Sequence, residues 1–200
     1  MRLAGAQTAG VSVLTNRYDN LRDGQNPSEV TLTPANVNSQ SFGKLFSSTL
    51  DGNAYGQPLY VPSVSIGGTT HNVVYVATEN DSVYAIDADT AGAPLWKVSF
   101  LNAMNNVTTV SDQIVSSKNP LPGCVDIKPV YGITSTPVID PNTNTIYVVA
   151  NTNDNGTINY RLHALDITTG QEKFGGPVLI QASIPGTGDD NDGNGNVLFD

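Results

Sequence analysis

The chain has 200 residues, with 19 glycines, 12 prolines and only 14% charged residues, which favours an all-β chain with many turns over a helical one. Its net charge of −9 comes from 18 acidic and 9 basic residues, and the basic residues are scattered, so no basic stripe is available to bind nucleic acid. A single cysteine, Cys124, excludes an intrachain disulfide, and no apolar run approaches the roughly 20 residues of a membrane span.

The first fifth of the chain, residues 1–41, is polar and shows little periodicity. We expect it to form an N-terminal arm packed on the surface of a sheet. Residues 42–50, FGKLFSSTL, then predict an extra strand that stands apart from the repeated units described next. Its Leu45-Phe46 pair aligns with the aromatic end of both later units, so we expect this strand to complete a further unit and to close a ring.

Residues 56–100 and 133–180 repeat one pattern of short apolar runs separated by turn residues. β-branched and aromatic residues bounded by Asn, Asp, Gly and Pro favour strands over helices. Pro58 and Pro137 place the opening strand of each repeat at a sheet edge, because proline cannot donate a hydrogen bond to a ladder. The strands expected in the first repeat span residues 57–61, 73–78, 82–87 and 95–100, and their counterparts lie between Thr136 and Ile180.

Residues 101–132 connect the two repeats and contain no further Val-Tyr-Val run, so we expect a long loop. A connection of this length inside a compact fold is either functional or disordered. Residues 181–200 are expected to be another loop or the start of the next repeat. Two repeats do not close a ring, and we therefore predict that the remaining repeats of a longer chain are partners of this one.

One short motif ends the third strand of each repeat and leads into the fourth. An alanine leaves room for a bulky neighbour, and the aspartate two residues later can accept hydrogen bonds from the backbone of the turn. A glycine then supplies a turn conformation that most residues avoid, and the aromatic residue four positions further on is expected to pack between adjacent sheets. The first copy consists of Ala85, Asp87, Gly92 and Trp96, and the second of Ala164, Asp166, Gly170 and Phe174.

Four-stranded repeats that begin at a sheet edge predict an all-β fold, a partial β-propeller with two four-stranded antiparallel blades and the extra N-terminal strand. The second copy of the motif, ALDITTGQEKF from Ala164 to Phe174, resembles the tryptophan-docking motif of quinoprotein alcohol dehydrogenase-like (PQQ-like) β-propellers, Ala-x-Asp-x-x-Thr-Gly-x-x-x-Trp. The first copy keeps the tryptophan but carries one extra residue. The resemblance covers roughly residues 42–180.

The resemblance implies a bacterial, extracytoplasmic protein, periplasmic or secreted, although residues 1–13 show no signal peptide. Quinoproteins of this fold bind pyrroloquinoline quinone (PQQ) and calcium in the central funnel. The chain lacks the adjacent cysteine pair of the alcohol dehydrogenase branch, and its one tryptophan belongs to the docking motif, so PQQ is not expected on this chain alone. We expect a non-catalytic scaffold or binding surface; the alternatives are a fragment of a PQQ-dependent dehydrogenase or of a carbohydrate-active propeller enzyme.

Asp190, Asp192 and Asn194, followed by Gly195, have the spacing of the first half of a calcium-binding loop, Asp-x-[Asp/Asn]-x-[Asp/Asn]-Gly. Alternate oxygen donors followed by glycine let the backbone curl around a hard cation. The same composition is also typical of a flexible surface loop. The sequence therefore leaves two interpretations open, a calcium site and a surface loop.

The end of the 101–132 connection leads into the innermost strand of the next repeat, and in a propeller it must approach the central axis. Asp126, Lys128 and Tyr131 would then lie closest to the channel, where they offer an acid, a base and an aromatic hydroxyl to a polar ligand, a protein or a carbohydrate. We predict that Asp126 and Tyr131 face a pocket reached by solvent. The alternative is that the three residues cap the core and satisfy one another.

Overall fold

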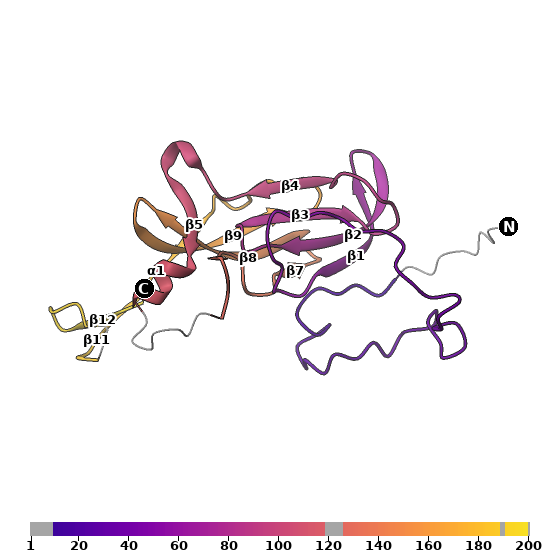
Figure 1. Ribbon diagram of the computed structural model, residues 1–200, viewed down its shortest axis with the longest axis horizontal. Coiled ribbons are helices and arrows are strands. Elements are labelled where there is room, and N and C mark those ends of the chain that lie inside the picture. Colours follow the sequence, from indigo (N-terminus) through magenta and orange to yellow (C-terminus); the bar gives the residue numbers. More distant parts are fainter. Residues whose placement is uncertain (1–9, 119–125, 189–190, 200) are drawn as a thin grey trace.

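The structure is a computed structural model that describes residues 10–118, 126–188 and 191–199. The strands in these ranges pair antiparallel and form three open sheets, so the prediction of an all-β chain is confirmed. Figure 1 shows the two larger sheets at the centre, the indigo N-terminal segment looping beside them and the yellow β11–β12 hairpin projecting at one end. No helix in the described part of the chain is long and apolar enough to cross a membrane.

The first sheet is a meander whose four strands follow one another in chain order. Its opening hairpin is longer than expected, because pairing between the first two strands resumes at Val64 and His71 beyond a bulge. Pro62 lies in that bulge, where its missing N–H breaks no ladder hydrogen bond. The strands are β1 (Leu59–Ile66), β2 (Thr69–Ala77), β3 (Ser82–Asp87) and β4 (Trp96–Ser99).

The second sheet is built on a long hairpin in which residues 145–154 pair with residues 157–166 over their whole length. Asn155 and Gly156 at the turn have φ values of 54° and 96°, the left-handed pair that a two-residue hairpin turn of type I′ requires. A short strand pairs with each side of the hairpin. Four of the six strands of this sheet are β7 (Val138–Asp140), β8 (Thr145–Asp154), β9 (Thr157–Asp166) and β10 (Val178–Ile180).

The connection 101–132 is not the plain loop that we predicted, because part of it joins the second sheet. Residues 107–109 pair with residues 152–154 of β8, on the edge that β7 occupies further along. The run VTTVS is β-branched but short and without an aromatic residue, so it gives a weak strand signal. The elements of the connection are η1 (Ala103–Asn105), β5 (Val107–Ser111), α1 (Asp112–Lys118) and β6 (Val130–Tyr131).

The extra N-terminal strand predicted over residues 42–50 is wrong, because these residues form no strand. Phe42 is 55% and Leu45 89% exposed, whereas Phe46 and Leu50 are half-buried. A strand needs a partner for its backbone N–H and C=O groups, and no described strand pairs with this segment. The ring-closing role of residues 42–50 stays a prediction.

The N-terminal segment instead contacts the opening strands of both sheets. The backbone groups of Val13 and Tyr60 in β1 exchange two hydrogen bonds, of 2.8 and 3.0 Å. The neighbouring carbonyl of Leu14 accepts a hydrogen bond of 2.8 Å from the N–H of Ile139 in β7. The segment therefore links the two sheets at their edges. At the other end of the chain, β11 (Ser183–Pro185) and β12 (Asn196–Leu198) form a separate hairpin.

The apolar core lies between the first and second sheets. On β3 the four residues 82–85 are all buried, so both faces of this strand are covered. On β8 the buried residues extend over residues 145–152 and provide the opposite wall. Fully or almost fully buried core residues of the two sheets are Leu59, Val73, Tyr75, Val83, Ala85, Ile139, Ile146, Val148, Ala150 and Leu165.

Asp51 fixes the segment before β1 to the β2–β3 turn. Its carboxylate accepts hydrogen bonds from the Thr78 hydroxyl (2.9 Å), the Ser82 hydroxyl (2.6 Å) and the Asn80 side-chain amide (3.2 Å), and it lies 2.8 Å from Lys97 Nζ. Burial raises the pKa of this carboxyl, but the hydrogen bonds from these four side chains outweigh burial and hold the pKa below its usual range.

We expect Asp51→Asn to lower the free energy of unfolding at pH 7 by about 2 kcal/mol, because charge-assisted hydrogen bonds are lost. A carboxyl with a lowered pKa in the folded state stabilises the protein above the unfolded pKa of about 4, and this contribution is lost as the pH falls further. The difference in the free energy of unfolding between the variant and the wild type should therefore narrow below about pH 4. Urea unfolding at neutral and acidic pH measures this difference.

The control for this prediction is Asp23→Asn, which changes an exposed carboxylate of the same N-terminal segment. This carboxylate accepts one local hydrogen bond, from the Gln25 N–H. We expect it to shift the free energy of unfolding by less than about 0.5 kcal/mol. Equal effects of the two substitutions would contradict the anchoring role of Asp51.

Candidate functional site

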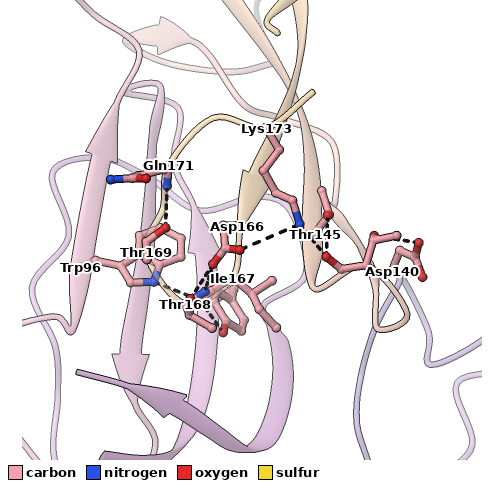
Figure 2. Close-up of polar contacts among 11 residues, drawn as sticks. Trp96, Asp140, Thr145, Asp166, Ile167, Thr168, Thr169, Gln171 and Lys173 are labelled. Atoms are coloured by element: carbon pink, nitrogen blue, oxygen red, sulfur yellow. Dashed lines mark hydrogen bonds and ion pairs between the residues drawn. The ribbon is translucent and has the colours of Figure 1, made fainter. Parts of the chain in front are cut away.

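The tryptophan of the first motif copy docks on the turn that follows β9 (Figure 2). Its indole N–H donates a hydrogen bond of 3.0 Å to the carbonyl of Ile167, and the Tyr75 hydroxyl donates one of 2.9 Å to the same oxygen. The rings of Trp96 and Tyr75 lie 5.8 Å apart. Gly170 has a φ of 70°, and a β-carbon there would come within 2.8 Å of the indole. The motif therefore joins the first sheet to the second.

The aspartates of the two motif copies accept hydrogen bonds from the turns that follow them. Asp87 Oδ1 accepts the backbone N–H groups of Asp89 and Thr90, at 2.8 and 2.9 Å. Asp166 Oδ1 accepts both the N–H and the hydroxyl of Thr168 (Figure 2). Burial raises the pKa of Asp166. The hydrogen bonds from Thr168 and the charge of Lys173 lower it by more than burial raises it, so the pKa lies below its usual value. Both carboxylates thus serve the turns.

The second copy of the motif does not repeat the docking of the first. Phe174, at the tryptophan position, is 70% exposed, and the fourth strand of this sheet is β10, which begins at Val178. No described sheet covers Phe174, so its packing between sheets stays a prediction. Gly92 also differs from the expectation, because its φ is not in the left-handed region. The alanines of both copies, Ala85 and Ala164, are buried as strand residues.

Tyr131 lines a pocket of about 380 Å³ beside the middle of β8 and the first half of β9. Two tyrosines, a threonine, a serine and an asparagine line it, together with apolar residues. None of the described residues that line it is charged. The lining residues are Ile127, Tyr131, Gly132, Thr134, Ser135, Val149, Asn151 and Tyr160.

The other two residues predicted for a ligand-facing loop lie elsewhere. Asp126 and Lys128 are exposed and are not among the residues that line the pocket. The structure therefore brings Tyr131 to a pocket without the acid and the base that we placed beside it. Ile127 rather than Asp126 lines the pocket together with Tyr131.

Two buried acids of the β2–β3 turn, Glu79 and Asp81, contact Gly132, which lines this pocket. Glu79 is 1% and Asp81 0% exposed. Glu79 Oε2 accepts hydrogen bonds from the Gly132 N–H (2.7 Å) and the Thr134 hydroxyl (3.0 Å). Its other oxygen and both oxygens of Asp81 have no hydrogen-bond partner among the described residues. Two buried carboxyl groups with free oxygens are uncommon, because burying a charge without compensation is unfavourable.

Burial raises the pKa of Asp81 to about 8. The backbone N–H of Asn151 lowers this pKa, although it does not reach hydrogen-bond geometry with either carboxylate oxygen. The charges of Glu79 and Asp51 raise the pKa further. A carboxyl group in this environment binds a proton or a cation readily.

The predicted calcium loop forms part of the β11–β12 hairpin. Asp192 Oδ1 accepts the backbone N–H groups of Asn194 and Asn196, at 2.7 and 3.1 Å, so the carboxylate serves the turn. Asp190 lies outside the described residues. No group of three or more His, Cys, Asp or Glu side chains that could hold a metal occurs within the described ranges. Calcium at Asp190, Asp192 and Asn194 stays a prediction.

Sequence reasoning missed Glu79 and Asp81, which it treated as polar residues of a hairpin turn. Acids in a turn between two strands are usually solvated, and the sequence gives no sign that this turn is covered. The cover comes from the segment around Gly132 and from Asn151 of β8, more than 50 residues away. Only the three-dimensional arrangement of the sheets brings these groups together.

Comparison of the chain with protein-family models, with curated proteins and with solved structures finds no match in any of the three.

Proposed function

We propose that this chain is a non-catalytic binding module of the PQQ-like β-propeller type, and that it binds an uncharged polar ligand, a carbohydrate, in the pocket beside Tyr131. The observation that carries the proposal is the uncharged lining of this pocket by Tyr131, Tyr160, the hydroxyls of Thr134 and Ser135 and the amide of Asn151. Tyrosine rings pack on the apolar faces of sugars, and hydroxyl and amide groups exchange hydrogen bonds with sugar hydroxyls. The pocket volume of about 380 Å³ suits one or two sugar rings.

The contacts between the sheets support the propeller part of the proposal. The first sheet is a four-stranded meander, and its Trp96 docks on the turn after β9, the third strand of the next unit. This relation between neighbouring units is what a tryptophan-docking motif provides. Further units of a longer chain would cover Phe174, and a bacterial, extracytoplasmic location follows from the same resemblance.

A fragment of a PQQ-dependent dehydrogenase and a fragment of a carbohydrate-active enzyme are the competing hypotheses. Both predict turnover, whereas the binding module predicts none. A dye-linked dehydrogenase assay with added PQQ and calcium, and a hydrolysis assay on neutral oligosaccharides, separate the three. Turnover in either assay would replace the proposal.

The direct test of the proposal is the binding of a panel of neutral mono- and oligosaccharides, measured by calorimetry. We expect saturable binding, and we expect Tyr131→Ala and Tyr160→Ala each to weaken it about tenfold or more, because each removes an aromatic face of the pocket. Tyr55→Ala is the matched control, since Tyr55 is 52% exposed and does not line the pocket. Asp126→Ala and Lys128→Ala should also leave the affinity unchanged.

Failure of every saccharide to bind would overturn the proposal. So would binding that survives both tyrosine substitutions. Tyr131→Phe keeps the aromatic face and its packing, so it should bind saccharide more tightly than Tyr131→Ala does. Thermal unfolding of each variant checks that the domain is intact.

A further inference from the structure

Three side chains present oxygen atoms without partners in the interior between the two sheets. They are Glu79 Oε1, both carboxylate oxygens of Asp81, and Asn151 Oδ1, all without a hydrogen bond to any described residue. The three side chains are 1%, 0% and 9% exposed, so solvent does not satisfy them. Buried polar atoms in folded proteins nearly always have a partner, and four unpaired oxygens in one region indicate a missing one.

These side chains come from different parts of the chain and meet around Gly132. The Gly132 N–H donates to Glu79 Oε2 at 2.7 Å, and a β-carbon on Gly132 would lie 3.0 Å from the carboxyl carbon of Asp81. The backbone N–H of Asn151 is close enough to Asp81 to lower its pKa. Asn151 lies in the stretch of β8 between the stretches that pair with β7 and β5. The oxygens are therefore held by two sheets and by the segment that joins them.

No basic side chain in the described ranges pairs with the carboxylates of this group. None of the ion pairs between described residues involves Glu79 or Asp81, and the nearby Lys97 pairs with Asp51. Buried carboxylates in proteins are paired with a base, protonated or bound to a metal ion. The donor set here contains only oxygen, from two carboxylates and one amide, which is the chemistry that calcium prefers over zinc.

We propose that Glu79, Asp81 and Asn151 form a binding site for one calcium ion at the junction of the two sheets. The two carboxylates neutralise the divalent charge, and the Asn151 amide oxygen supplies a neutral ligand from β8. The ion would connect the β2–β3 turn of the first sheet to the second sheet. This site is separate from the Asp190–Asn194 loop and adjoins the saccharide pocket, with which it shares Asn151. Its test measures calcium binding alone and does not depend on saccharide binding.

Calorimetric titration of the chelator-treated protein with calcium chloride tests the proposal. We expect one calcium ion bound per chain, and we expect the unfolding midpoint to rise by about 5 °C in about 1 mM calcium. Glu79→Gln and Asp81→Asn each remove one anionic ligand with little change in shape. Both should abolish calcium binding and the calcium-dependent rise of the midpoint.

Asp192→Asn is the matched control, because it removes a carboxylate from the other Asn- and Asp-rich stretch. It should leave the calcium stoichiometry unchanged. Binding that is lost in Asp192→Asn and kept in Asp81→Asn would overturn the proposal and place the ion in the β11–β12 hairpin. Absence of calcium binding to the wild-type protein would also overturn it. In that case an Asp81→Asn variant as stable as the wild type would identify a protonated Asp81 as the explanation of the free oxygens.

Discussion

Replacing Trp96 with alanine is expected to lower the free energy of unfolding by about 3 kcal/mol. The half-buried indole packs against Tyr75 and Gly170, and its N–H donates to the carbonyl of Ile167 on the other sheet. Alanine removes both the packing and the hydrogen bond. Urea unfolding followed by far-ultraviolet circular dichroism measures the effect, since this residue is the one tryptophan of the chain and its fluorescence is lost in the variant.

The chain supplies a matched control at the equivalent position of the second motif copy. Phe174 is 70% exposed, and Phe174→Ala should change the free energy of unfolding by less than about 0.5 kcal/mol. Trp96→Phe keeps an aromatic ring but loses the N–H donor, so we expect an intermediate effect of about 1 kcal/mol. Equal effects of Trp96→Ala and Phe174→Ala would show that the indole does not stabilise the junction of the sheets.

Gly132→Ala is expected to destabilise the protein by a similar amount, about 3 kcal/mol, because it adds a methyl group where there is no room for one. A β-carbon at Gly132 would lie 2.4 Å from the backbone oxygen of Glu79 and 2.7 Å from its carbonyl carbon. These atoms cannot move aside easily, because the Glu79 N–H donates to the Asn53 carbonyl and the Ile133 N–H donates to the Thr78 carbonyl. The added methyl group must therefore force the two sheets apart.

Gly92→Ala is the control for the glycine substitution. No described atom lies within 4 Å of a β-carbon at Gly92, and its φ is not left-handed. We expect an effect within about 0.5 kcal/mol, with a small gain because alanine restricts the unfolded chain. Thermal and urea unfolding of both variants give the comparison. A Gly132→Ala protein as stable as Gly92→Ala would mean that the segments around Gly132 are not held as tightly as the hydrogen bonds indicate.

The first sheet could be predicted from the sequence because each of its strands carries its own local signal. The runs around Tyr75 and Ala85 are apolar, β-branched and bounded by turn residues, and they pair with their neighbours in the chain. The connection could not be predicted in the same way. Its strand β5 is defined by pairing with β8 more than 40 residues later, and the run VTTVS alone does not reveal a distant partner. Residues 42–50 show the converse, an apolar run without a partner strand.

The candidate site followed the same division. Tyr131 could be placed near a pocket because it lies at the end of a connection that leads into the next unit. Glu79 and Asp81 could not be identified, since their burial depends on Gly132 and Asn151 from the second unit. Local sequence predicts the turn in which these acids stand. It does not predict what covers that turn.

The acceptor at the junction of the sheets is a main-chain atom, the Ile167 carbonyl, which takes hydrogen bonds from both Tyr75 and Trp96. Every amino acid supplies the same carbonyl, so the chemical identity of position 167 is irrelevant to these two bonds, although its side chain is buried. The donors are side chains and can be lost by a single codon change. Substitutions at position 167 should therefore be tolerated as long as the new side chain fits, whereas Tyr75 and Trp96 should be constrained because they are the donors. The two hydrogen bonds are in this respect one-sided: one unit donates them from specific side chains, and the other accepts them at a main-chain carbonyl.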